Sequence, residues 1–161
     1  MYVLAPETAA DTPEIEDLYD AAFVPGRTAL SSYRLRDGVA PLHDLARVAR
    51  DRDGVVAGAI RYWPVRIEAW PLLLLGPVAV HPTRQGEGLG AVLIEESLAA
   101  ATAAGWPRVL LVGDAPYYGR FGFARLESVE MPPPTNPDRI LGRALIPDAY
   151  TGVRGRVERW A

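Results

Sequence analysis

The sequence contains no cysteine, and this absence excludes several kinds of protein. Without a thiol the chain forms no disulfide, holds no metal through thiolates and carries no acyl group on a cysteine of its own. The absence leaves the redox state of the compartment open. Histidine is almost as scarce, since His43 and His81 are the only two and lie far apart in the sequence. Two isolated imidazoles are too few for a zinc cluster, so we expect no metal site.

Lysine is also absent, so every basic side chain is an arginine. The formal net charge is −3 and no basic block occurs, which argues against a nucleic-acid partner. The longest strongly apolar run, Leu72–Leu75, is far shorter than the ~20 residues of a membrane-spanning helix. The first residues show neither the basic start nor the apolar stretch of a signal peptide. We expect a soluble, cytoplasmic protein that binds neither nucleic acid nor membrane.

The length of 161 residues and the hydrophobic content of 49% suit a single domain, residues 1–161. A helix is expected after Asp11–Glu14, where apolar residues follow at helical spacing, and a weaker one over Thr28–Arg36. Alternation then predicts strands at Leu45–Arg50 and Val55–Ala69, with a bend at Trp70-Pro71.

The segment Leu72–Val80 is apolar on both faces, as a central strand should be. Because proline offers no N–H to a neighbouring strand, Gly76-Pro77 within it suggests a bulge or splay. A helix over Gly88–Ala104 and a strand over Arg108–Gly113 follow, which implies a parallel strand pair with a right-handed crossover. The expected class is α/β with a mixed sheet. A short helix and three further strands are expected at Pro116–Phe121, Ala124–Glu130, Ile140–Ile146 and Gly155–Trp160.

The segment from Val78 to Gly90 carries the strongest chemical signal, a buried strand that leads through a Gly-rich turn into a helix. Glycine lets the backbone approach a ligand closely, and the first N–H groups of a helix have no internal partner. With the helix dipole they form an anion site suited to a pyrophosphate, and Arg84 adds positive charge at its edge. The plainer alternative is a tight turn before a helix, with no ligand.

Two common phosphate-binding loops are excluded here. The Walker pattern needs a lysine, which the chain lacks. The dinucleotide fingerprint Gly-x-Gly-x-x-Gly does not fit either, because Gly86, Gly88 and Gly90 are spaced by two.

The pattern Gln85-x-x-Gly88-x-Gly90 after an apolar strand instead resembles the acetyl-CoA signature of the GNAT superfamily of acyltransferases. The segment Leu110–Phe123, which reads LLVGDAPYYGRFGF, resembles a second conserved region in the YhbS-like branch of predicted N-acetyltransferases. The tail Ala144–Gly155 is similar to the same branch. The similarity covers the C-terminal two thirds well and the first forty residues hardly at all.

This resemblance implies an acetyl-CoA-dependent enzyme of the GNAT fold, in which the fourth and fifth strands splay apart to admit the thioester. The splayed strands would be Leu72–Val80 and Arg108–Gly113. The pyrophosphate would lie on the loop amides, and the pantetheine arm would pair with the strand edge. The cofactor-binding residues implied in this way are Val78, Ala79, Val80, Arg84, Gln85, Gly86, Glu87, Gly88, Leu89, Gly90, Asp114 and Tyr117.

Tyr118 stands in the Tyr-x-x-x-Gly-Phe arrangement where the superfamily often keeps a general acid. Its role would be to protonate the CoA thiolate, since a phenol with a pKa near ~10 keeps its proton at neutral pH. The alternative is a packing aromatic beside Tyr117. No general base stands out: Asp114 is expected to cap the short helix, Glu68 to face solvent, and His81 to lie in a surface turn at the strand end.

The acceptor would be a small-molecule or peptide amine, attacking directly in a ternary complex. The variable N-terminal region of the family often lines the acceptor site, which makes the Arg27–Arg36 stretch a candidate lining, together with His43, Trp63 and Trp70. Their plainer interpretation is core aromatics and solvated charge. A non-catalytic acyl-CoA-binding module of the same fold remains the rival function. Because dimers are common in the superfamily, the resemblance also allows a homodimer.

Overall fold

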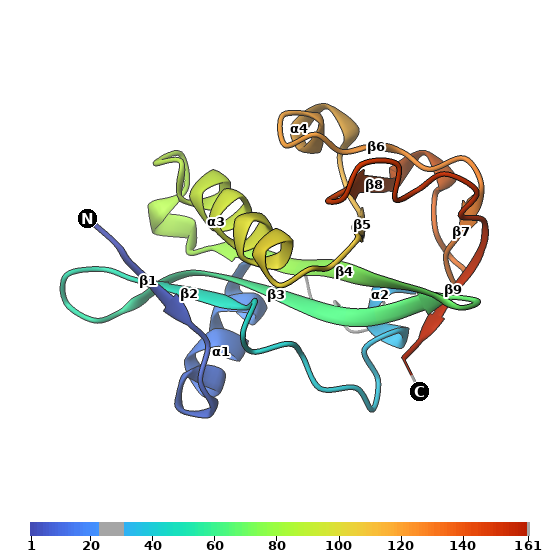
Figure 1. Cartoon of the computed structure of the whole chain (residues 1–161). Coiled ribbons are helices and arrows are strands. Elements are labelled where there is room, and N and C mark those ends of the chain that lie inside the picture. The colour runs from blue at the N-terminus through green and yellow to red at the C-terminus, as the bar shows by residue number, and fades with distance from the viewer. Residues whose placement is uncertain (23–30, 161) are drawn as a thin grey trace.

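The computed structural model describes residues 1–22 and 31–160 (Figure 1). Its helices are α1 (Thr12–Ala22), α2 (Ser31–Arg34), α3 (Leu89–Ala103) and α4 (Ala115–Gly119), with short 3-10 turns η1 (Ala9–Asp11), η3 (Pro82–Arg84) and η4 (Pro137–Arg139). Its strands are β1 (Val3–Pro6), β2 (Arg47–Arg50), β3 (Val56–Ile67), β4 (Trp70–Val80), β5 (Arg108–Val112), β6 (Ala124–Arg125), β7 (Val129–Glu130), β8 (Ile140–Ala144) and β9 (Gly155–Arg159).

The strands form a mixed sheet in the order β1-β2-β3-β4-β5-β8-β6. Neighbours on this path are antiparallel except β4 and β5, which run parallel because α3 carries the chain across between them. β9 pairs with the far end of β3, beyond β2, and with the short β7. The β7–β9 pair is also parallel, and the sequence-derived class, α/β with a mixed sheet, is confirmed.

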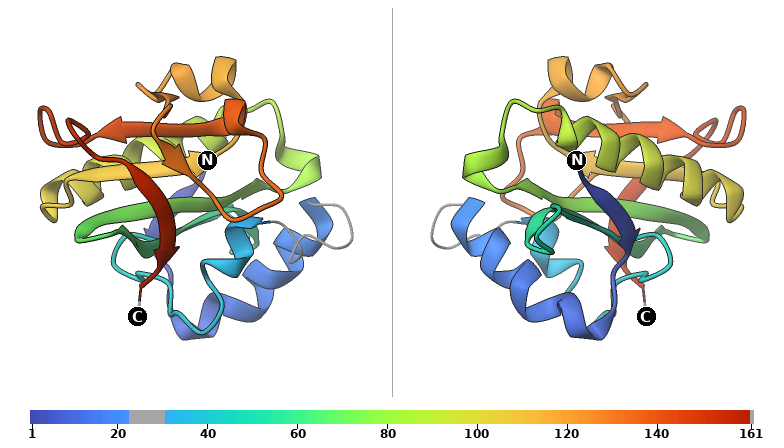
Figure 2. Two further views of the ribbon diagram at one scale, coloured as in Figure 1. Left: turned by 90° about the vertical axis from the view of Figure 1, so that its right-hand side faces the viewer. Right: turned by 90° about the vertical axis from the view of Figure 1, so that its left-hand side faces the viewer.

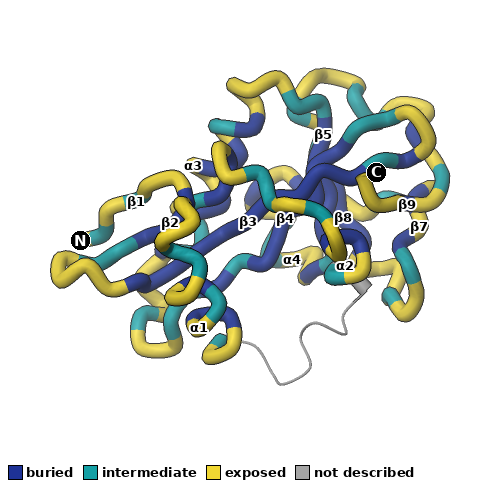
Figure 3. Tube along the Cα trace, turned by 90° about the horizontal axis from the view of Figure 1, so that it is seen from below, coloured by how far each residue is buried: buried dark blue, intermediate teal, exposed yellow. Residues whose placement is uncertain are grey.

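Helices cover both faces of the sheet, α3 on one side and α1 on the other (Figures 1 and 2). The long central strands β3 and β4 are therefore buried along most of their length, while the loops and the outer ends of the chain are exposed (Figure 3). No helix in the described part of the chain has both the length and the apolar character that a bilayer crossing requires.

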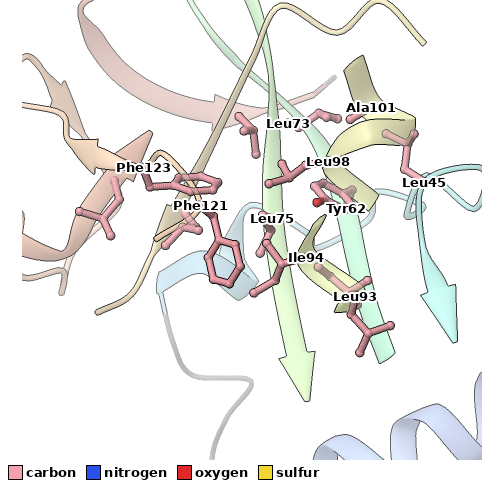
Figure 4. Close-up of a cluster of buried hydrophobic side chains, with 14 of the residues drawn as sticks. Leu45, Tyr62, Leu73, Leu75, Leu93, Ile94, Leu98, Ala101, Phe121 and Phe123 are labelled. Carbon is pink, nitrogen blue, oxygen red and sulfur yellow. The ribbon is translucent and has the colours of Figure 1, made fainter. Parts of the chain in front are cut away.

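The apolar side of α3 packs on β3 and β4 (Figure 4). Its residues Leu93, Ile94 and Leu98 share one buried cluster with Tyr62 of β3 and with Leu73 and Leu75 of β4. All three α3 residues are buried, as helical spacing of apolar residues predicts. Gly58 in β3 permits this close approach: a Cβ there would lie 2.9 Å from Leu93 Cδ1. The contact sets the position of the start of α3, and thus of the Gly-rich loop before it.

Several predicted boundaries were wrong. The bend expected at Trp70-Pro71 lies earlier, so both residues belong to β4. The single strand expected over Ala124–Glu130 is divided into β6 and β7, because a turn between them sends the two halves to different partners, β8 and β9. In the weaker helical stretch only Ser31–Arg34 is helix within the described residues, and residues 28–30 lie outside them.

Candidate active site

A bulge in β4 creates the opening at the centre of the sheet. The register of β4 against β3 shifts beside Gly76-Pro77, where the sequence suggested a bulge. Two buried side chains hold the bulged backbone from the α1 side: Trp63 Nε1 donates to the Gly76 carbonyl at 2.7 Å, and the Tyr19 hydroxyl donates to the Pro77 carbonyl at 3.2 Å. The bulge is therefore a fixed feature of the core.

Beyond the bulge, β4 and β5 separate. Their parallel pairing joins Leu73 to Val109 and Leu74 to Leu110, and no later pair is formed in the described strands. The predicted splay is thus confirmed, and it opens a cavity of about 280 Å³, here called the cleft. The cleft is lined by Tyr33, Arg36, Leu75, Gly76, Pro77, Val78, Leu111, Val112, Gly113, Asp114, Tyr118 and Arg139.

The Gly-rich loop forms a second pocket, of about 310 Å³, in front of α3. Gly86 and Gly88 adopt φ of +88° and +80°, a backbone conformation that other residues rarely take, and no atom lies within 4 Å of the Cβ that either lacks. Outside α3 itself, the amides from Gln85 to Ala91 donate to no other described residue. Unpaired amides, open space and the start of a helix fit a diphosphate.

Because successive side chains of a strand point to opposite faces of the sheet, the predicted cofactor residues of β4 do not all reach the pockets. Val78 lines the cleft and Val80 lines the loop pocket, whereas Ala79 between them is buried in the cluster under α1. Leu89 lines the loop pocket from a buried position at the start of α3.

Arg84 is more constrained than the sequence suggested. Its Nη2 donates to Asp51 Oδ2 at 2.7 Å, and its guanidinium lies near the ring of Tyr2. The Tyr2 hydroxyl donates in turn to Glu87, which is exposed. These contacts join the loop to Tyr2, just before β1, and to Asp51 in the β2–β3 turn. Arg84 therefore helps to fix the position of the loop and also adds positive charge to it.

Arg120 was not predicted from the sequence, and it lines the loop pocket together with Arg84. Its guanidinium lies 5.1 Å from the ring centre of Tyr117 and 5.5 Å from that of Phe121, and it forms no ion pair with any described residue. An arginine just after α4 carries no signal in a single sequence, because only the fold brings α4 beside the start of α3.

Tyr118 lies in the cleft and Tyr117 in the loop pocket. Burial raises the pKa of Tyr118 to about 12, so its phenol is protonated at neutral pH. Its hydroxyl forms no hydrogen bond within residues 1–22 and 31–160. A protonated donor that faces a cavity and has no protein partner is available to a ligand.

The candidate bases are placed less favourably. Asp114 lines the cleft, but its Oδ2 accepts the amide N–H of Tyr117 at 3.0 Å, which confirms the predicted cap of α4. Glu68 is exposed at the turn between β3 and β4, and the ring of His81 bonds Thr83. No cluster of three acidic or histidine side chains suited to a metal occurs in the described residues.

The candidate acceptor lining is brought together only in part. Arg36 reaches the cleft, and Trp63 lies behind it in the core. His43 lies elsewhere, 3.8 Å from buried Glu7, and Trp70 lies beside the β3–β4 turn. Arg27 is outside the described residues.

The comparisons with known proteins decide the family. The model of the acetyltransferase (GNAT) domain matches residues 43–125. The chain is 32% identical to the uncharacterised N-acetyltransferase YhbS of Escherichia coli K12, over 94% of this chain and 92% of that protein. The chain belongs to the GNAT acetyltransferase family. The expected enzyme class and the YhbS-like branch are thereby confirmed.

Two solved structures resemble the whole chain. The Escherichia coli YhbS structure in complex with CoA has a TM-score of 0.85 at 29% identity and covers 99% of this chain and 89% of its own. A GNAT acetyltransferase of Brucella melitensis in complex with acetyl-CoA has a TM-score of 0.75 at 32% identity and covers 100% and 97%. These two relatives bind the cofactor that the sequence predicts for this GNAT protein.

Proposed function

We propose that this protein transfers the acetyl group of acetyl-CoA to a primary amine, which attacks directly in a ternary complex, and that Tyr118 is the general acid. The observation that carries the proposal is the unpartnered, protonated Tyr118 hydroxyl in the cleft between β4 and β5. Proton donation from such a position contributes typically ~10²–10⁴-fold to a rate.

The proposed cofactor position follows from the two pockets. The diphosphate would lie on the amides of Gln85–Gly90, with Arg120 and Arg84 beside it. The pantetheine arm would run along the free edge of β4 from Val80 to Val78, since the other edge of this segment already pairs with β3. The relatives in complex with CoA and acetyl-CoA support this assignment.

Acetyl-CoA supplies the activated thioester carbonyl. A neutral amine that enters the cleft forms the new C–N bond as the C–S bond breaks. Tyr118 gives its hydroxyl proton to the leaving sulfur, and the proton released from nitrogen returns to the phenolate oxygen. Atoms and protons then balance without a separate base, which fits a cleft whose one described carboxylate, Asp114, already caps α4.

The experiment is a release assay. Purified protein is mixed with acetyl-CoA and a panel of primary amines, free CoA thiol is titrated, and the acetylated amine is identified by mass spectrometry. We expect stoichiometric CoA and N-acetyl product with at least one amine. Tight acetyl-CoA binding without transfer to any amine would instead favour the non-catalytic acyl-CoA-binding module.

A further inference from the structure

Arg36 is a buried cation in the wall of the cleft. It follows α2, its side chain is only 8% exposed, and it lines the cavity beside Tyr33 and the bulge of β4. Burial lowers its pKa to about 10, so the guanidinium is still charged at neutral pH. Its side chain hydrogen-bonds that of Tyr33, but it pairs with no carboxylate among the described residues. Arginine is seldom buried without an ionic partner, so this position calls for an explanation.

The polar atoms of this guanidinium are incompletely satisfied. Nε and Nη1 are buried and have no hydrogen-bond partner among the described residues. The flat face lies 4.2 Å from the ring centre of Tyr33 and 5.5 Å from that of Trp63, which stabilises the cation but leaves those N–H groups unused. A buried donor without an acceptor costs free energy, and such a group at a cavity points to a ligand.

The cleft around it favours an anion. Arg139 lines the same cavity and forms no ion pair with a described residue, whereas Asp114 is the one described carboxylate in the lining and is engaged by the Tyr117 amide. Two guanidinium groups against one carboxylate leave the cleft net positive. A guanidinium is a planar fork that matches the two oxygens of a carboxylate.

The source of this anion follows by elimination. The cofactor diphosphate is accounted for by the loop pocket, which shares no lining residue with the cleft. The acetyl group carries no charge. The remaining reactant is the acceptor. We propose that Arg36 binds a carboxylate on the acceptor, so that the substrate is a small amino acid or a similar amino-carboxylic acid. This inference rests on the acetyl-transfer function proposed above.

The test compares amines that differ only in the carboxylate. Glycine, alanine and leucine are assayed against glycinamide, alaninamide and leucinamide, with propylamine as an amine that lacks both groups. Loss of one partner of a buried charge pair costs at least a factor of about 30, so the wild type should prefer at least one acid over its amide by about that factor in kcat/KM. Equal use of the amides, transfer to propylamine alone, or no transfer within any pair would overturn the proposal.

Three variants test whether Arg36 causes the preference for an acid over its amide. Arg36→Met keeps the length of the side chain and should reduce the acid-to-amide preference to about twofold or less. Arg36→Lys keeps the charge without the fork and should retain part of it. Arg66→Met removes an arginine that pairs with Glu158 at the surface and should change nothing. A preference that persists in both Arg36 variants would contradict the assignment.

Thermal unfolding separates a binding role from a structural one. Arg36→Met removes a buried cation that has two unsatisfied N–H groups and no ionic partner among the described residues, so Tm should stay unchanged or rise if the role of Arg36 is to bind a ligand. A fall in Tm would show that its contacts with Tyr33 and Trp63 are structural. If succinyl-CoA outperforms acetyl-CoA and Arg36→Met reverses that preference, the carboxylate belongs on the acyl group and the acceptor proposal fails. Two further outcomes distinguish this proposal from the acetyl-transfer function on which it rests. Transfer to propylamine alone would overturn the acceptor proposal and leave the acetyltransferase function intact. Failure of the protein to bind acetyl-CoA would remove the acetyltransferase function itself.

Discussion

Tyr117 and Tyr118 are consecutive residues of α4, and each lines a different pocket. Their rings meet edge to face, with centroids 5.0 Å apart and planes at 84°. Tyr117 lies with the Gly-rich loop, and Tyr118 lies in the cleft. The Asp114 cap fixes the first turn of α4 and so sets both orientations together. One short helix therefore spans the proposed binding and reacting ends of the cofactor.

The first prediction concerns the general acid. Tyr118→Phe keeps the ring and removes only the hydroxyl, so turnover should fall by roughly 10²–10⁴-fold. Acetyl-CoA affinity should stay nearly unchanged, because the diphosphate lies at the other pocket. Steady-state kinetics and calorimetry on the same preparation check this. Full activity in the variant would remove Tyr118 from the mechanism.

The second prediction is a pH dependence of stability. The pKa of Tyr118 is about 12 in the folded protein, against about 10 in an unfolded chain. The unfolded chain therefore releases this proton first, and the stability that the neutral phenol contributes is present below pH ~10 and is lost as pH rises towards ~12. Urea unfolding from pH 8 to 11 should show wild type losing stability relative to Tyr118→Phe above pH ~10. A constant difference across this range would contradict the burial argument.

The third prediction tests how closely the cleft wall fits the Tyr118 ring. A Cβ at Gly113 would lie 2.6 Å from Tyr118 Cε2, so Gly113→Ala should displace the ring. A displacement of about 1 Å near the reacting atoms can cost ~10²-fold in rate, and kcat should fall while acetyl-CoA binding persists. Gly119→Ala is the matched control, because no atom lies within 4 Å of its Cβ. Equal kcat in the two variants would show that the Gly113 contact does not position the tyrosine.

The fourth prediction assigns Arg120 to the diphosphate. Arg120→Ala should weaken acetyl-CoA binding by roughly tenfold, as expected for the loss of one charge-assisted contact, and should reduce the salt dependence of binding. Arg156→Ala, at an exposed residue of β9, is the control and should bind normally. Calorimetry at two salt concentrations measures both the affinity for acetyl-CoA and its salt dependence. Unchanged affinity in Arg120→Ala would contradict the assignment and leave the diphosphate to the loop amides and Arg84.

Much of the fold could be predicted from local pattern. The apolar period of α3 and the apolar strands on either side of it indicated the crossover, because each signal depends on neighbouring residues. The bulge at Gly76-Pro77 was foreseeable for the same reason, since proline cannot donate to an adjacent strand. The splay of β4 and β5 was implied by the resemblance to the GNAT superfamily.

The site was only partly predictable. Motif spacing pointed to Tyr118 and the loop, and the resemblance pointed to the Arg27–Arg36 stretch as a whole. It did not single out Arg36 or name Arg120, because both join their pockets through contacts between distant segments, which no short window records. The buried position of Arg36 in the cleft depends on its packing against Trp63 and on its closeness to Gly76 in the bulge. The division of the Ala124–Glu130 segment was missed because strand partners are set by tertiary contacts.

The most direct test of the whole account is a calorimetric titration of acetyl-CoA into the wild type, Gly88→Glu and Gly105→Glu. Gly88 and Gly105 have similar positive φ, +80° and +88°, and neither has an atom within 4 Å of its missing Cβ, so the two variants carry comparable backbone strain. They stand at opposite ends of α3. The account predicts micromolar-range binding by the wild type and Gly105→Glu, and loss of binding in a folded Gly88→Glu, whose carboxylate repels the diphosphate. Binding that survives in Gly88→Glu, or is absent from the wild type, would contradict it.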